Sequence, residues 1–195
     1  MTMLRRHTVF ANRKFKFTEN FEYPDGALPN GWLPILTGNF TGKTANVVAR
    51  QLAPSASSGR YAFLRPESLL DTVQEVIQVS RDTGFGGGGV LLARMQNDQN
   101  GYFIYYGTPG GGGGIYRIVN NVSTLISATT TRTPVANDRL RLTVQGSSLK
   151  FEILANGVVV ETRIAIDTTF TGAGKCGLGE AFGGAVLDDY SLRQL

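Results

Sequence analysis

Residues 139–160 carry the stretch that decides the fold, and they read RLRLTVQGSSLKFEILANGVVV. Apolar and polar side chains alternate in it with a period of two, which is typical of a β-strand with one buried face. The side chains predicted to point inward are Leu140, Leu142, Val144, Leu149, Phe151 and Ile153. Asn156-Gly157 joins two of these runs and is a strong hairpin signal, because both central residues of a type I′ turn need positive φ. Together with a turn at 145–148, the pattern predicts a three-stranded antiparallel meander over 139–166.

Short runs of the same kind recur along the chain. In 73–79, one face holds Val73, Ile77 and Val79, and the other holds Gln74 and Gln78. Further strands are predicted at 89–96, 101–107 and 114–119, with 175–182 and 185–193 as the closing pair. No stretch sustains a helical period, although a short helix is left open at 66–70. Many short strands separated by Gly, Asn, Asp and Ser indicate an all-β sandwich or barrel.

Composition excludes several classes of protein. The 195 residues suit one domain, and 42% hydrophobic residues are too many for a disordered chain. Nineteen basic against fifteen acidic residues give a net charge of +4, which predicts no specific nucleic-acid partner. No apolar run approaches the roughly 18 residues that span a bilayer, so no membrane partner is expected. The N-terminus has no secretory signal pattern, which predicts a protein made in the cytoplasm.

The order of the C-terminal runs resembles one fold family. The 139–160 stretch, GKCGLG at 174–179 and LDDYSL at 187–192 look like the concanavalin A-like (laminin G-like) jelly roll. FTENFEYPDGALPNGW at 17–32 is similar to the opening strand and loop of such domains in bacterial polysaccharide-active proteins and bacteriophage virion proteins. The resemblance covers about residues 15–195.

This resemblance implies an all-β, two-sheet antiparallel jelly-roll sandwich. It also implies that residues 17–21 pair with 187–192, and that ligands sit on the concave sheet or at its rim. We therefore divide the chain into an extended N-terminal arm at 1–16 and a sandwich domain at 17–195.

Catalytic residues are not predicted. The enzyme branch of the family carries Glu-x-Asp-x-x-Glu on one strand, which supplies a nucleophile and a general acid. This chain lacks the motif, and Glu75 has no partners at those offsets. Asp188 and Asp189 are adjacent, so a strand would point them to opposite sides. The only cysteine, Cys176, falls in a predicted buried strand, and the only histidine, His7, falls in the arm.

No cofactor or metal site is predicted either. A single cysteine and a single histidine rule out a multi-cysteine metal site. The loop carboxylates Asp25, Asp98 and Asp167 leave a structural calcium ion open, but no EF-hand spacing supports one.

A glycan site is suggested by the run Tyr102-Phe-Ile-Tyr-Tyr106. Aromatic faces flanked by polar groups suit sugars, and alternation places Tyr102, Ile104 and Tyr106 on one side of this strand, with Phe103 and Tyr105 on the other. The candidate carbohydrate-binding residues are Arg94, Gln96, Tyr105, Tyr106, Tyr116 and Arg117. The alternative is that one face is core and the other carries tyrosines of ordinary β-propensity. Trp32 is expected to pack under the N-terminal loop.

The N-terminal arm suggests docking onto a partner through basic and apolar side chains. Its candidate contact residues are Arg5, Arg6, Phe10, Arg13, Lys14 and Phe15. The leading hypothesis is a non-enzymatic bacteriophage virion component, located in the virion as a capsid decoration or tail-associated protein. Its expected partners are capsid or tail subunits and further copies of itself. The alternative is a carbohydrate-binding module or host-surface glycan adhesin, and a third is a glycoside hydrolase.

Overall fold

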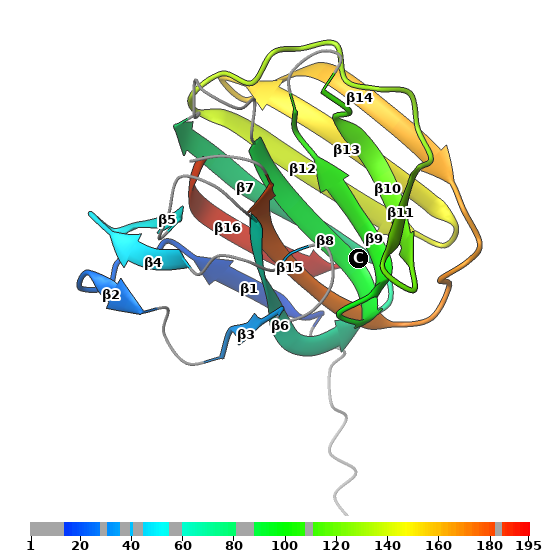
Figure 1. Cartoon of the computed structure of the whole chain (residues 1–195), viewed down its shortest axis with the longest axis horizontal. Coiled ribbons are helices and arrows are strands. Elements are labelled where there is room, and N and C mark those ends of the chain that lie inside the picture. The colour runs from blue at the N-terminus through cyan, green and yellow to red at the C-terminus, as the bar shows by residue number, and fades with distance from the viewer. Residues whose placement is uncertain are drawn as a thin grey trace, which may run out of the picture.

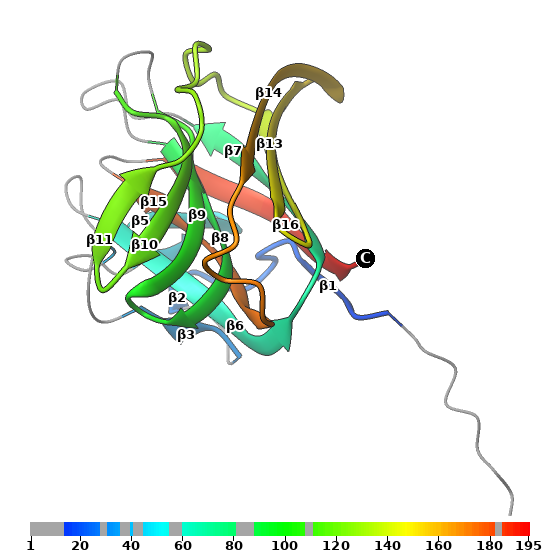
Figure 2. The ribbon, with the colours of Figure 1, turned by 90° about the vertical axis from the view of Figure 1, so that its right-hand side faces the viewer.

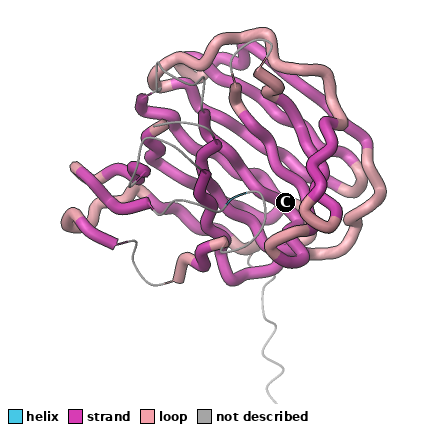
Figure 3. The backbone as a smooth tube through the Cα atoms, in the orientation of Figure 1, coloured by secondary structure: helices cyan, strands magenta, loops and turns pink. Residues whose placement is uncertain are grey.

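The protein is an all-β sandwich of two antiparallel sheets (Figures 1 and 3). The computed structural model describes residues 14–27, 31–35, 40, 45–54, 60–80, 88–107, 111–181 and 185–195. The predicted fold class is confirmed. The helix left open at 66–70 is wrong, because this segment lies within the strand Arg60–Leu69 and the bend after it. Within the described residues, no helix is long and apolar enough to cross a lipid bilayer.

One layer, the nine-strand sheet, contains the predicted meander. Its strands, in spatial order across the described residues, are β14 (Val158–Ile166), β13 (Ser148–Ala155), β12 (Asp138–Gln145), β7 (Thr72–Ser80), β16 (Val186–Gln194), β5 (Gln51–Pro54), β4 (Ala45–Val48) and β2 (Gly26–Ala27), with β1 (Lys16–Glu19) also paired to β16. Asn156 and Gly157 have φ of 50° and 79°, which is the geometry expected of the β13–β14 turn. The three-stranded meander is therefore confirmed.

The other layer, the seven-strand sheet, packs face to face against the first (Figure 2). Its strands, in spatial order across the described residues, are β11 (Val122–Leu125), β10 (Gly114–Val119), β9 (Asn100–Tyr105), β8 (Gly88–Asn97), β15 (Gly174–Ala181), β6 (Arg60–Leu69) and β3 (Leu33–Pro34). β15 and β16 do not pair with each other, as a closing pair would. β15 lies between β8 and β6, whereas β16 crosses to the opposite sheet.

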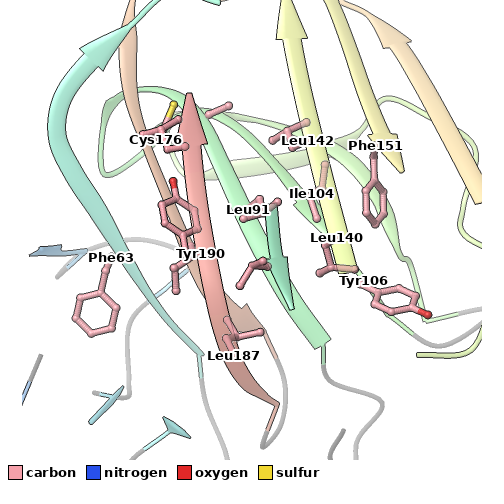
Figure 4. Close-up of a cluster of buried hydrophobic side chains, with 14 of the residues drawn as sticks. Phe63, Leu91, Ile104, Tyr106, Leu140, Leu142, Phe151, Cys176, Leu187 and Tyr190 are labelled. Carbon is pink, nitrogen blue, oxygen red and sulfur yellow. The ribbon is translucent and has the colours of Figure 1, made fainter. Parts of the chain in front are cut away.

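The core between the sheets is formed by the side chains predicted to point inward (Figure 4). Leu140, Leu142, Val144, Leu149, Phe151 and Ile153 are all buried. Leu91, Ile104 and Leu178 of the seven-strand sheet meet them from the other layer. Burial of apolar surface is the main force that holds two such sheets together.

β7 turns its amide face inward. Gln74 and Gln78 are fully buried, whereas Ile77 and Val79 on the opposite face are only partly buried. The Gln74 amide donates to the Leu92 carbonyl oxygen at 2.9 Å, and Gln78 Oε1 accepts from the Gly89 amide at 2.8 Å. Both partners lie on β8, so the two glutamines hydrogen-bond one sheet to the other. Gln74 is satisfied at both ends of its amide, since its Oε1 also accepts from the Tyr190 hydroxyl at 2.8 Å.

The first described strand, β1, is tied into the nine-strand sheet. β1 pairs antiparallel with β16, with Phe17 opposite Leu192, as the resemblance implied. The Phe15 carbonyl oxygen accepts from the Gln194 amide at 2.9 Å, so the sheet begins one or two residues before Phe17. Trp32 is buried against this strand, with ring centroids 5.9 Å from Phe17 and 5.4 Å from Tyr190. Its expected packing role is confirmed.

The central strands of the seven-strand sheet are buried on both faces. All residues of β8 from Gly88 to Met95 are buried. In a sandwich whose sheets each expose one face to solvent, every second residue would be exposed. A second apolar cluster covers the outer face of this sheet, formed by Ile35, Phe40, Ala62, Leu64, Val90, Leu92, Met95, Phe103, Tyr105, Ile118 and Ala181. This outer cluster positions the candidate site.

Candidate functional site

A pocket of about 270 Å³ opens in the outer cluster of the seven-strand sheet. It is lined by residues of β6, β9, β10, β11 and β15, and half of the lining residues are aromatic. The lining residues are Phe40, Arg60, Phe103, Tyr105, Gly111, Tyr116, Ser123 and Ala181.

Strand register builds the aromatic wall of this pocket. Alternation along β9 sends Phe103 and Tyr105 to the outer face, and the β9–β10 register sets Tyr116 opposite Phe103. Their rings are stacked, with centroids 4.8 Å apart and an interplanar angle of 8°. Phe40 meets Phe103 edge-on at 5.2 Å. Cross-strand aromatic pairs of this kind stabilise a sheet and leave a flat apolar surface.

Gly112, shortly before β10, fixes the polar end of Tyr116. The Tyr116 hydroxyl donates to the Gly112 carbonyl oxygen. Gly112 has a φ of +82°, and a Cβ there would lie 2.8 Å from the same hydroxyl oxygen. The backbone conformation therefore favours glycine at this position, and a side chain there would displace the Tyr116 hydroxyl.

Polar groups complete the pocket. Burial raises the pKa of Tyr105 to about 12, so its phenol is a protonated hydrogen-bond donor at neutral pH. Burial also lowers the pKa of Arg60, which the neighbouring Tyr105 partly offsets. Even so, a guanidinium keeps its charge at neutral pH. The pocket lining thus combines an aromatic wall with a phenol and a cation.

Only Tyr105 and Tyr116 of the six predicted carbohydrate-binding residues line this pocket. Arg94 is 1% exposed and sits in a bulge of β8 with a φ of 48°. Its guanidinium donates to the carbonyl oxygens of Leu70, Gly146 and Phe170 at 3.0, 2.6 and 2.9 Å, and to Asp71 Oδ1 at 2.9 Å. Arg94 therefore ties together three chain segments inside the molecule and does not face the pocket.

Tyr106 follows β9 and faces the inter-sheet core (Figure 4). Its hydroxyl donates to Asp138 Oδ2 at 2.5 Å. Asp138 also accepts a bidentate pair of bonds from Arg132, at 3.0 and 2.9 Å. Tyr105 and Tyr106 are neighbours in sequence on opposite faces, so one platform cannot use both.

Arg117 and Gln96 hold loops. Arg117 lies opposite Tyr102 in the β9–β10 register and donates to Asp167 Oδ2 at 2.9 Å, which anchors the loop after β14. The Gln96 amide donates to the carbonyl oxygens of Arg94 and Ala173, both at 3.1 Å. Neither residue joins the pocket lining.

Asp167 is expected to make stability depend on pH. Burial opposes its ionisation, but hydrogen bonds from Tyr102 and Thr169 and the charge of Arg117 outweigh burial and hold its pKa below the ordinary value. The ionised form therefore stabilises the fold above the unfolded pKa of about 3.9, and this stabilisation is lost as the pH falls through the folded pKa. Urea unfolding between neutral and acid pH should show a smaller acid-induced loss for Asp167→Asn than for the wild type. An identical loss in both proteins would contradict this role.

Sequence reasoning missed Phe40, Arg60, Phe103 and Ser123. Phe103 could have been found from the alternation of β9, since it shares the face of Tyr105. Arg60 and Phe40 come from segments far away in sequence, and no local pattern links them to β9.

The predicted docking residues fall mostly outside the described residues. This applies to Arg5, Arg6, Phe10 and Arg13. Lys14 is exposed, whereas Phe15 packs against the core of its own chain. Docking through the arm stays a prediction.

Groups suited to nucleophilic or metal chemistry are engaged elsewhere. Cys176 lies in β15 and is buried, as predicted, and burial raises the pKa of its thiol to about 11. Glu75 pairs with Arg141 at 2.6 Å and with Arg139 at 3.5 Å. Among the described residues, no three His, Cys, Asp or Glu side chains gather where they could hold a metal ion.

A second hollow, of about 300 Å³, lies on the nine-strand sheet beside β1 and β16. Its lining is polar, and its charged groups already have partners. Arg139 lies 3.8 Å from Asp189, and Glu19 Oε1 accepts from the Phe21 amide at 3.0 Å. The ring of Tyr190 is fully buried, so this hollow presents no aromatic face. The outer aromatic pocket is the better candidate for ligand binding.

Comparison with known proteins finds no protein-family model and no curated protein sequence that matches the chain. Solved structures do match. The carbohydrate binding module CBM66 from Bacillus subtilis is similar with a TM-score of 0.60 and 18% identity, over 85% of this chain and 96% of that one. The VIP36 exoplasmic/lumenal domain in its Ca²⁺/Man3GlcNAc-bound form has a TM-score of 0.63 and 13% identity, over 91% of this chain and 88% of that one. Lectin I-B4 from Griffonia simplicifolia has a TM-score of 0.59 and 10% identity, over 91% of this chain and 98% of that one.

These neighbours lend no support to a virion role, so the virion hypothesis, with its capsid or tail partners and its location, stays a prediction. At such low identity the likeness concerns the fold. The chain has the two-sheet jelly-roll sandwich that these lectin and carbohydrate-binding domains share.

Proposed function

We propose that the protein is a non-enzymatic carbohydrate-binding domain and that it holds a glycan in the outer aromatic pocket. The observation that carries the proposal is the stacked Phe103–Tyr116 wall beside Arg60 and Tyr105. A pyranose has an apolar C–H face and a polar rim, which match an aromatic wall flanked by hydrogen-bonding groups.

The fold neighbours support this reading. One is a carbohydrate binding module, and another, VIP36, has a mannose-containing ligand bound. Their likeness concerns the fold, so the sugar that this chain would take is not transferred from them.

Binding without catalysis is the form of the proposal that the pocket supports. Glycoside hydrolysis in most families needs two carboxylates flanking the scissile bond. The described residues that line the pocket include no Asp or Glu. We therefore expect a bound glycan to be released unchanged.

Tyr116→Ala should weaken glycan binding by at least about tenfold, because it removes one of the two stacked rings and the phenol held by Gly112. The measurement is a glycan array followed by calorimetric titration of the best ligand. Tyr23→Ala is the matched control, since Tyr23 is 41% exposed and does not line the pocket. Equal affinity of wild type and Tyr116→Ala, with both proteins folded, would refute the site.

A further inference from the structure

The strand β14 forms an end of the nine-strand sheet, visible in orange at its rim in Figure 1. It pairs with β13 on one side, and no strand of the described residues pairs with its other side. Three of the most exposed large hydrophobic side chains lie on it, with 65% of Val158, 59% of Ile164 and 69% of Ile166 accessible. A long apolar edge strand is a template for pairing with another chain.

The alternation of backbone hydrogen bonds between β13 and β14 shows which backbone groups of β14 point to its free edge. The Asp167 amide donates to the Ser147 carbonyl oxygen at 3.0 Å, which continues by one residue the register that sets Ile166 opposite Ser148. In an antiparallel ladder, every second residue turns its N–H and C=O to the same neighbour. The even residues Thr162, Ile164 and Ile166 therefore turn theirs to the free edge. In agreement, the guanidinium of Arg163 reaches the Thr162 carbonyl oxygen at 2.8 Å.

The strands next to this edge carry charged side chains. On the same outer face, the next strands carry a chain of ion pairs, in which Glu152 contacts Lys150 at 3.1 Å and Arg141 at 3.6 Å. Arg141 in turn contacts Glu75 at 2.6 Å. A partner lying flat on the sheet would have to desolvate these charges, whereas a partner strand added at the edge would not.

Glu161 and Arg163, the two neighbours of Thr162 in sequence, carry opposite charges on the other face of β14, where both are held in place. The Glu161 carboxylate accepts from the amides of Thr131 and Arg132, both at 2.8 Å. The Arg163 guanidinium donates to the Thr129 carbonyl oxygen at 2.8 Å and lies 2.6 Å from Glu161. The loop after β11 therefore holds both side chains in place.

We propose that β14 pairs antiparallel with β14 of a second copy of this chain, about a two-fold axis through Thr162. This register sets Glu161 opposite the partner's Arg163 in the regular part of the strand. Beyond the β-bulge that shifts the β13–β14 register after Glu161, it brings the exposed Ile164 and Ile166 of each copy alongside the exposed segment Val158–Val160 of the other, so these side chains bury one another. Moving the axis to Glu161 or Arg163 would set that charge opposite its own copy, which is unfavourable. Pairing replaces the Arg163 contact at the Thr162 carbonyl by a backbone bond and joins two nine-strand sheets into one. This dimer proposal goes beyond the proposed glycan binding and does not depend on it.

Sedimentation velocity of the full chain over a micromolar concentration series tests this. The wild type should sediment as a dimer, and Ile164→Lys should weaken dimerisation by at least about tenfold, because it places a lysine at the edge. Val122→Lys is the matched control: Val122 is 66% exposed on β11, at the rim of the other sheet, and should leave the dimer intact.

Thr162→Pro provides a second variant. It removes an N–H that faces the free edge, so the β13–β14 ladder is retained and the fold should survive, while the two-fold bonds are lost. A monomeric, folded Thr162→Pro would support the proposed register. A monomeric wild type, or folded Ile164→Lys and Thr162→Pro that dimerise like the wild type, would overturn the proposal.

Discussion

Replacing Arg94 by alanine should lower the free energy of unfolding by about 3 kcal/mol, because it removes a buried side chain and the donor of several hydrogen bonds at once. The Arg94 side chain is 2% exposed, and its guanidinium donates to three carbonyl oxygens and to Asp71. Alanine would leave these acceptors without their donor and open a cavity between the loops that they belong to.

Urea unfolding followed by circular dichroism measures this loss. Arg94→Lys should recover only part of it, because an ammonium lacks the planar fork that reaches several acceptors at once. Arg50→Ala is the control, since Arg50 and Glu22 form a pair in which both side chains are more than half exposed, and such pairs contribute about 0–1 kcal/mol. A loss below about 1 kcal/mol for Arg94→Ala would contradict the structural role.

Asp138→Ala should cost about 3 kcal/mol or more, because Asp138 is 2% exposed and accepts from Tyr106 and twice from Arg132. Without the carboxylate, the Tyr106 hydroxyl keeps only its 3.2 Å bond to the Thr133 carbonyl oxygen. The Arg132 guanidinium would lose its buried counter-charge.

A double-mutant cycle with Tyr106→Phe tests whether the two residues act together. The combined loss in unfolding free energy should be smaller than the sum of the single losses, because both substitutions remove the same hydrogen bond. Glycan binding by the folded Tyr106→Phe protein should equal that of the wild type, since Tyr106 faces the core. Full additivity would show that the bond does not couple them.

The predicted site illustrates where sequence reasoning ends. Alternation correctly divides Tyr105 from Tyr106, but every residue of this run is apolar or aromatic, so the pattern does not say which face is core. Both faces turn out to be buried, one against the opposite sheet and one in the outer cluster. Charge also misleads for Arg94, because an arginine on a strand suggests a wet surface until carbonyl oxygens from three loops are seen around it.

The glutamines of β7 show the same limit. The pattern separates Gln74 and Gln78 from the apolar face, yet the amide face is the buried one. Their partners, Leu92 and Gly89, lie on a strand of the other sheet, and nothing in the local sequence announces them.

The sequence by itself determined the strands, the hairpin turns and the inward residues of the 139–166 meander, because these depend on side-chain alternation and on the positive φ of Asn156-Gly157. Tertiary structure alone decided that β15 and β16 lie in different sheets and that the central strands of the seven-strand sheet are buried on both faces. It alone brought Arg60 and Phe40 to the aromatic wall of β9 and β10. Such contacts join residues far apart in the chain, and their free energy depends on which surfaces meet, which no local period encodes.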